Sequence, residues 1–415
     1  MKTIFAFLAF AMLFLASSCQ KDSLDDNTGK YEEIPLDEKS AQIVDADNQF
    51  GLELFQHVYN SETNYKNIMV SPLSVSLALA MTYNGAVGDT KTAMQETLKL
   101  YGLTPEEINT SYKTLVNALK SLDSKVILEI ANAIYYRDNF QVELDFINTN
   151  ENYYDAKISA LDFSSPNAVK TINNWVADKT NNKIETILNE ISPDQVMFLL
   201  NAIYFKGIWE SKFEKENTER KDFYPENGTT IQTDFMQQTN AVLYSSTNLF
   251  SAIQLPYGQG NYNMYVFLPN EDKTLQDITD NLNGDNWELW KENFYERNVD
   301  IEFPKFKYEY EIKLNDILSD MGMGIAFSPF GADFTGINKN GGLNIDYVKH
   351  KSFIEVNEEG TEAAAVTVVA IELTSVGPDQ NILFKVNRPF MFAITEKSTG
   401  AILFIGTVKS PVFDN

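Results

Sequence analysis

Residues 357–370 of the chain have the sequence NEEGTEAAAVTVVA. Beyond Glu358-Glu359-Gly360-Thr361, residues 362–374 contain neither proline nor glycine, so the sequence signals no ordinary turn there. The alanines at 363–365 suit a helix, whereas residues 366–369 are all β-branched and favour a strand. The segment is therefore small, apolar and undecided between loop and strand.

An alternation within this segment fits a strand that is buried on one face. Side chains alternate across a strand, so every second residue shares a face. One face would carry only uncharged residues that are small or β-branched, namely Thr361, Ala363, Ala365, Thr367 and Val369. Glu362 and Glu372 would lie on the other face. The lack of proline also suits a central strand, which needs every main-chain N–H.

The composition excludes several functions. The 415 residues, of which 44% are hydrophobic, suffice for a large core. An excess of 58 acidic over 33 basic residues gives a net charge of −25, which argues against nucleic-acid binding. The chain has two histidines and lacks the common nucleophile, zinc-protease, phosphate-loop and dithiol motifs. We therefore expect no catalytic residue, metal or cofactor, although a hydrolase that uses carboxylates alone is left open.

The N-terminus resembles the signal of a bacterial lipoprotein. Lys2 precedes about a dozen mostly apolar residues, too few to span a membrane. The run ends in the sequence LASSC, in which small residues suit cleavage and the thiol of Cys19 would receive the lipid. A general secretory signal with an incidental cysteine is the alternative. Because Cys19 is the only cysteine, we expect no disulfide.

These features predict three regions: a signal peptide at 1–18, a flexible acidic tether at 19–43 and a folded domain at 44–415. The protein would be exported and anchored in a bacterial membrane through Cys19, as an outer-membrane or cell-surface lipoprotein. The sequence leaves open whether it faces the periplasm or the exterior.

The folded part is expected to be one α+β domain. Helices are predicted at 46–60, at 71–81 as a run buried on all sides, and at 105–122 after the start signal of Thr104, Pro105 and Glu107. Strands are predicted at 126–136, 196–206, 251–256, 262–268 and 299–309, with a helix at 167–179 between them. Residues 382–408 are expected to be β throughout, with a hairpin turn at 397–400. Helices followed by strands without a βαβ rhythm are typical of the α+β class.

Five blocks resemble the serpin family. They are SPLSVSLALAM at 71–81, INNWV at 172–176, LNAIYFKGIW at 200–209, EEGTEAAA at 358–365 and NRPFMFAITEKSTGAILFIGTVKSP at 387–411. They follow the order of the family from about residue 46 to residue 411. The resemblance implies the serpin fold, with helices packed around three β-sheets and an exposed reactive-centre loop, and it implies that the protein is not an enzyme.

The resemblance implies a monomeric suicide inhibitor that forms a covalent complex with a serine protease. The protease cuts the loop, and the loop then inserts as a new central strand of a sheet while it still carries the acyl-enzyme. The usual family spacing from Gly360 places the reactive bond at Thr374-Ser375, and cleavage at Leu373, Ser375 or Val376 is left open. A small uncharged residue at 374 favours elastase-like or subtilisin-like targets.

The resemblance also implies roles for individual residues. The hinge of the loop comprises Glu358, Glu359, Gly360, Thr361, Glu362, Ala363, Ala364 and Ala365. Glu358 and Lys305 match an ion pair at the point where the loop enters the sheet, above Trp209. The residues that match a hydrogen-bonded cluster under the opening part of the sheet are Ser71, Ser74, Asn201 and His350. Asn182 stands where the family usually has glycine, and asparagine tolerates left-handed backbone.

A non-inhibitory serpin that acts as a binding or carrier module is the alternative. Such members usually carry charge, proline or bulk in the hinge. Thr361 and the alanines at 363–365 lack these features, so inhibition is the favoured hypothesis. A hydrolase of the cell envelope is supported only by the abundance of carboxylates.

Overall fold

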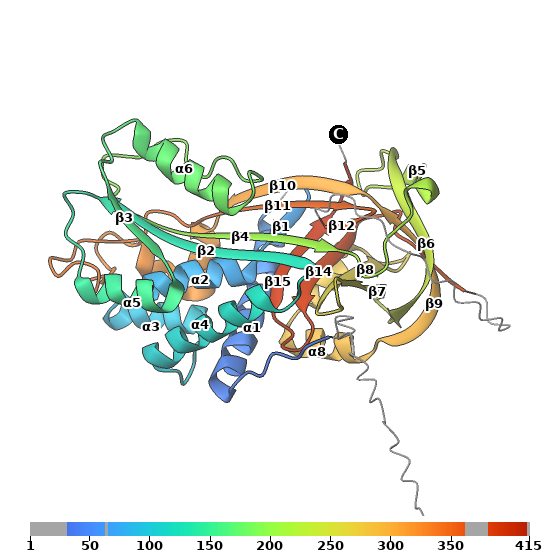
Figure 1. The fold of residues 1–415 in the computed structure, drawn as a ribbon, viewed down its shortest axis with the longest axis horizontal. Coiled ribbons are helices and arrows are strands. Elements are labelled where there is room, and N and C mark those ends of the chain that lie inside the picture. Colours follow the sequence, from blue (N-terminus) through green and yellow to red (C-terminus); the bar gives the residue numbers. More distant parts are fainter. Residues whose placement is uncertain (1–30, 63–64, 362–380, 413–415) are drawn as a thin grey trace, which may run out of the picture. The chain divides into compact units, whose positions relative to one another are not determined.

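The computed structural model describes residues 31–62, 65–361 and 381–412 (Figure 1). The helices of these ranges are α1 Glu38–Ser61, α2 Pro72–Tyr83, α3 Gly88–Thr97, α4 Pro105–Ser121, α5 Leu144–Tyr154, α6 Asn167–Lys179, α7 Leu275–Asp280, α8 Gly284–Glu292 and α9 Asn315–Leu318. The strands are β1 Ile68–Val70, β2 Val126–Arg137, β3 Lys157–Leu161, β4 Met197–Ile208, β5 Glu219–Phe223, β6 Ile231–Ser246, β7 Phe250–Tyr257, β8 Tyr262–Pro269, β9 Tyr295–Pro304, β10 Phe306–Lys313, β11 Lys349–Asn357, β12 Gly360–Thr361, β13 Ile382–Lys385, β14 Phe390–Glu396 and β15 Ile402–Val408. No helix in the described ranges is long and apolar enough to cross a membrane.

The strands form two hydrogen-bonded sheets. One has six strands in the order β10-β11-β12-β4-β2-β3, and the other has nine, in which β6 also pairs with β5. The expected number of sheets was three. Hydrogen bonding merges two of them, because residues 243–246 of the long β6 pair with β7 while residues 235–244 pair with β9. The mixture of helices and sheets confirms the α+β class.

The six-stranded sheet lies between two helical layers, with α6 on one face and α1 to α5 on the other (Figure 1). Alternate residues of β4 serve the two faces. Ile203 and Phe205 join the main core, whereas Phe198 and Ala202 pack in a second cluster with Trp175 of α6. Both faces are therefore covered, as a central strand requires.

Two helices begin where local sequence signals predict. Thr104 and Glu107 form a capping box at the start of α4, and Pro105 occupies its first turn. In α2 the Ser71 side chain caps the first turn, and every residue except Ala78 is buried. The predicted run that is buried on all sides is thus a helix inside the molecule. Asn182 also adopts the expected left-handed backbone, with φ of 60°.

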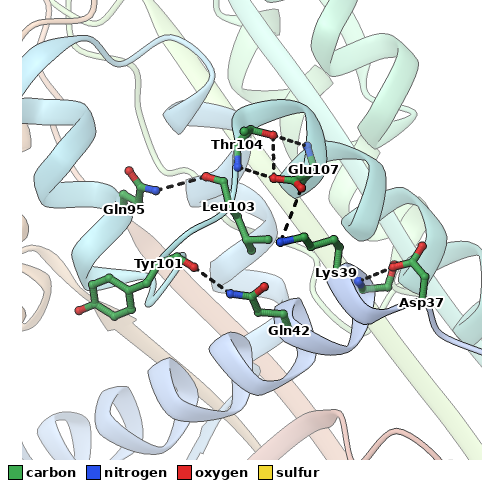
Figure 2. A network of polar contacts seen from close by, with 9 residues as sticks. Asp37, Lys39, Gln42, Gln95, Tyr101, Leu103, Thr104 and Glu107 are labelled. Carbon is green, nitrogen blue, oxygen red and sulfur yellow. Dashed lines mark hydrogen bonds and ion pairs between the residues drawn. The ribbon is translucent and has the colours of Figure 1, made fainter.

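The folded part begins earlier than the predicted boundary at residue 44. The carboxylate of Asp37 caps α1 by accepting from the Ser40 N–H at 2.7 Å, so the helix starts eight residues before the expected position 46. Figure 2 shows how the first turns of α1 are held. Lys39 Nζ lies 3.6 Å from Glu107 Oε1, and Gln42 Nε2 donates to the Tyr101 carbonyl at 2.8 Å. Because these residues are polar, the helical spacing of apolar residues could not reveal the first turns of α1.

Residues 31–36, predicted as tether, also contact the folded part. The Tyr31 ring lies 4.4 Å from Lys397 Nζ, and the Ile34 N–H donates to Ser398 Oγ at 3.0 Å. Ile34 is buried and packs into the main core. Only the portion of the predicted tether before Tyr31 lies outside the described residues.

The strand predicted at 299–309 is two strands in different sheets. β9 ends at Pro304 in the nine-stranded sheet, and β10 begins at Phe306 in the six-stranded sheet. Lys305 lies between them, and its N–H donates to the Asp234 carbonyl at 2.8 Å. The chain therefore changes sheets at Lys305, where its side chain reaches the end of β11.

Candidate functional site

A two-residue strand, β12, lies between β11 and β4. Thr361 pairs with Val356 on one side and Gly207 on the other, and Gly360 pairs with Asn357 and Ile208. Among the residues that the structure describes, β12 is the only strand that joins β11 to β4. In the described part of the chain, the gap between β4 and β11 is thus bridged by β12 at one end only.

Gly360 is required at this position. Its φ is +148°, and a Cβ placed on it would lie 2.1 Å from the Gly207 carbonyl oxygen. No side chain fits so close to main chain, so only glycine lets the hairpin of β11 and β12 fold against β4. Glu358 and Glu359 form the turn of this hairpin.

Thr361 points into the core beneath the sheet. It is 3% exposed, and its hydroxyl lies 2.5 Å from the Tyr257 hydroxyl. Tyr257 in turn stacks on Trp209, with 4.4 Å between ring centroids and 12° between planes. Burial raises the pKa of Tyr257 well above its ordinary value, so the phenol is neutral and can donate to Thr361. Thr361 therefore has a buried hydrogen-bond partner beneath the sheet.

Trp209, Lys305 and Glu358, which were predicted to lie where the loop enters the sheet, are close together. Lys305 Nζ is 3.2 Å from Glu358 Oε2, and the Trp209 indole N–H donates to the Asn357 carbonyl at 3.0 Å. Thr218 donates its hydroxyl to Glu358 Oε1 at 2.8 Å. Burial alone would raise the pKa of Glu358, but the hydrogen bonds to its main-chain N–H and to Thr218, together with Lys305, outweigh burial and lower it. Glu358 is therefore a charged, nearly buried residue with several partners.

The neighbouring Glu359 is held by lysines that the sequence did not single out. Lys212 Nζ lies 2.5 Å from Glu359 Oε2, and Lys215 Nζ lies 3.6 Å from Oε1. The main chain of the same segment adds two bonds, from the Trp209 N–H to the Glu359 carbonyl and from the Phe213 N–H to the Glu358 carbonyl. Residues 209–213 therefore clamp the hairpin turn from one side.

Three of the four residues of the predicted cluster are connected. His350 Nε2 accepts from the Ser71 N–H at 3.2 Å, and Ser71 Oγ accepts from the Ser74 N–H at 3.3 Å. Burial lowers the pKa of His350 to about 4, so the imidazole is neutral near pH 7, as an acceptor must be. Asn201 instead donates to Asn132 on β2 at 2.8 Å, and its buried Oδ1 has no partner among the described residues.

A cavity of about 510 Å³ lies along the parts of β4 and β11 that β12 does not reach. Its walls include Leu199 and Asn201 of β4, His350 of β11, and Ser74 and Leu79 of α2. Its other walls include the segments that precede the two strands, together with Phe140 and with Val176 of α6. The cavity thus continues the line of β12 between the two strands.

A family model described as Serpin (serine protease inhibitor) matches residues 45–411. The chain belongs to the serpin family. It is 33% identical to an uncharacterized serpin-like protein of Methanosarcina mazei, over 98% of each chain. Among solved structures it resembles the native state of tengpin, a thermophilic serpin, at 37% identity and a TM-score of 0.81, covering 91% of this chain and 96% of tengpin. Human thyroxine-binding globulin, complexed with its hormone, gives a TM-score of 0.81 at 28% identity, covering 90% and 100%.

The family confirms the fold that the sequence resemblance implied. Serpins are usually protease inhibitors rather than enzymes, and they form covalent complexes with target serine proteases. In this serpin, β12 consists of Gly360 and Thr361, two of the residues predicted to form the hinge.

Several predicted residues of this serpin lie outside the described ranges. They are Cys19, Glu362, Ala363, Ala364, Ala365, Thr374 and Ser375. The described hinge residues are Glu358, Glu359, Gly360 and Thr361. Tyr257, Thr218, Lys212 and Asn132 contact the predicted residues but were not predicted. They lie in segments distant from residues 357–361 and carry no motif, so only the folded chain brings them together.

Proposed function

We propose that this serpin inhibits serine proteases through cleavage of its reactive loop and insertion of the loop between β4 and β11. The observation that carries this proposal is β12 itself. Gly360 and Thr361 are already paired with both neighbouring strands, and no other strand of the described residues occupies the space beyond them. Unpaired edges of two strands are a template for an added strand.

The register of β12 predicts how insertion continues. Thr361 lies opposite Gly207 and Val356, so a residue six positions further along the loop, Thr367, comes opposite Asn201 and His350. β4 begins at Met197, which makes room for residues 362–371. At ~3.3 Å per residue, these ten residues span about 33 Å. The uncharged face inferred from the sequence would then lie on the core side, where Thr361 lies.

Thr367 gains a partner in this register. The Asn201 Oδ1 is buried without a partner in the described residues, and a threonine hydroxyl opposite it can donate. Loop insertion would therefore satisfy a polar atom of the predicted opening cluster. This supports a role for Asn201 in the inserted state, whereas Ser71, Ser74 and His350 hold the sheet to α2 before insertion.

The proposed reactive bond is Thr374-Ser375, with Leu373, Ser375 and Val376 as alternative cleavage positions. A small uncharged residue before the bond fits the shallow apolar pocket of an elastase-like or subtilisin-like protease. A trypsin-like pocket would leave its buried acid unpaired, and residues 361–384 contain no lysine or arginine. Glu372 weakens binding to a protease with an acidic surface.

The test is incubation with elastase, subtilisin and trypsin, followed by a denaturing gel and mass spectrometry of the released fragment. We expect a covalent complex with elastase or subtilisin, and a released C-terminal fragment that begins at Ser375. Cleavage without any complex would support the carrier alternative instead. Tight trypsin inhibition with a cut after Lys385 would contradict the proposed bond.

We also propose that the protein is exported and anchored through a lipid on Cys19, as a monomer on a bacterial envelope. The sequence LASSC at 15–19, which resembles the cleavage and lipidation site of bacterial lipoproteins, supports lipid anchoring. The Cys19→Ala protein should leave the detergent phase in a phase-separation experiment, while the folded domain inhibits as before. Membrane association retained by Cys19→Ala would contradict lipid anchoring.

A further inference from the structure

A carboxyl group lies buried between helices that the proposed inhibitory mechanism does not use. Asp47 of α1 is 5% exposed, and its Oδ1 accepts from the Tyr112 hydroxyl of α4 at 2.7 Å. Its Oδ2 is buried without a hydrogen-bond partner in the described part of the chain. Ser76 of α2 is fully buried, and its hydroxyl, which faces Asp47, also lacks a partner there. One carboxyl thus stands at the junction of three helices.

Among the described residues, no nearby cation lowers the pKa of Asp47. Neither α2 nor β15, which both pack on α1, carries a charged residue. The titratable groups that face Asp47 are Tyr112 of α4 and Tyr154 of α5, whose rings lie 6.1 Å apart. The acidic residues Asp280 of α7, Glu288 of α8 and Asp316 of α9 are exposed. No ion pair joins Asp47 to a lysine, arginine or histidine in the described ranges.

The two protonation states of Asp47 differ in what they offer these neighbours. A protonated carboxyl accepts from Tyr112 on one oxygen and can donate from the other toward the Ser76 hydroxyl. An ionised carboxylate can only accept, and it places an unpaired charge between three helices. The neutral form therefore fits this junction better than the charged form.

We propose that Asp47 is a proton-sensitive point in the helical layer, at which loss of a proton weakens the packing of α1 against α2 and α4. Burial raises the pKa of Asp47 to about 7, against the hydrogen bond from Tyr112 and the nearby Ser76 hydroxyl, which lower it. The pKa in the folded state is then above the ordinary 3.8 of the unfolded chain. The stabilisation is complete below about pH 4 and is lost as pH rises through about 7.

This weakening would reach the strands through the neighbours of Asp47. Asn48 accepts from the Ile402 N–H of β15 at 3.0 Å and donates to the Gly400 carbonyl at 3.0 Å. Ser76 belongs to the helix whose start, at Ser71, contacts His350 of β11. Ionisation of Asp47 would therefore loosen the support of both sheets at neutral and alkaline pH.

The test compares the thermal midpoint of the full chain with that of Asp47→Asn, which has a similar shape but cannot ionise. We expect the variant to melt on the order of 5 °C higher than wild type at pH 8, with the difference vanishing near pH 4. Asp145→Asn on α5 is the control, because Asp145 is exposed, and it should follow the wild-type profile. A constant difference between Asp47→Asn and wild type across this pH range would overturn the proposal.

Tyr112→Phe probes the same carboxyl group if Asp47→Asn does not fold. Tyr112→Phe removes the hydroxyl that stabilises the carboxylate, so the Asp47 carboxyl band in infrared difference spectra should titrate at a higher pH than in wild type. A band that titrates in the ordinary range near pH 4 in the wild-type protein would also overturn the proposal. Neither measurement depends on protease inhibition.

Discussion

At the scale of single residues, the hinge of this serpin is defined by what each side chain meets. Thr361 touches Tyr257 in the core, Glu358 is held by Lys305 and Thr218, and Gly360 leaves no room for a Cβ. Each of these contacts links residues that are far apart in the sequence.

Replacement of Thr361 by arginine should convert the inhibitor into a substrate. The position is 3% exposed, and an uncompensated buried charge costs roughly 3–5 kcal/mol. The loop should still be cut, but the protease should be released active, as shown by a high stoichiometry of inhibition and no stable complex on a gel. Thr361→Ser is the matched control and should inhibit like wild type. Equal inhibition by the arginine variant would show that the side chain does not face the core during insertion.

His350 makes native stability depend on pH in the opposite sense to Asp47. Its pKa falls from 6.5 to about 4 on folding, so stability is full above pH 6.5 and is lost as pH falls toward 4, by roughly 3 kcal/mol. His350→Gln retains an acceptor for the Ser71 N–H but cannot gain a proton. In denaturant titrations this variant should lose less stability than wild type between pH 7 and pH 4.5. Identical pH profiles would contradict the assignment of His350 as a buried neutral acceptor.

At the scale of elements, helices with local sequence signals were predicted, whereas boundaries that depend on tertiary contacts were not. The capping box of α4, the apolar run of α2 and the helix at 167–179 are local signals, and the structure confirms these helices. The start of α1 and the break at Lys305 depend on tertiary partners such as Glu107 and Asp234, which no local pattern contains. For the same reason, the sequence identified Trp209, Lys305 and Glu358 only through family resemblance and did not identify Tyr257.

The hairpin of β11 and β12 should depend on the glycine at position 360. In Gly360→Ala the new methyl group would lie 2.1 Å from the Gly207 carbonyl oxygen, so β12 should leave its place between the strands. We expect a slower start of insertion and a larger share of cleaved, non-complexed protein. Gly228→Ala is the control, because that glycine also has positive φ but has open space around it. Unchanged complex formation by Gly360→Ala, with the control also unchanged, would contradict the requirement for glycine in the hairpin.

At the scale of the whole molecule, the six-stranded sheet is incomplete in the described structure. Completion by residues 362–371 would add main-chain hydrogen bonds to both β4 and β11, each worth ~1 kcal/mol net. The sum is on the order of 10 kcal/mol, comparable with the entire stability of an ordinary domain. The proposed mechanism therefore requires a native form that is less stable than its cleaved form.

Cleavage of the loop by a protease that escapes inhibition should raise the thermal midpoint markedly. The freed loop would fill the cavity between β4 and β11 and pair with both strands. Calorimetry of the protein before and after cleavage measures the effect, with mass spectrometry to show that only the loop was cut. Equal midpoints for the two forms would rule out insertion.

The contacts of residues 31–36 have a practical consequence for protein production. A version trimmed to the start of the first helix, at Glu38, would remove Ile34 from the core and take the ring of Tyr31 away from Lys397. The uncovered apolar surface would favour self-association during purification and storage. A version that begins at Tyr31 should stay monodisperse in light scattering, whereas one that begins at Glu38 should form larger species over time.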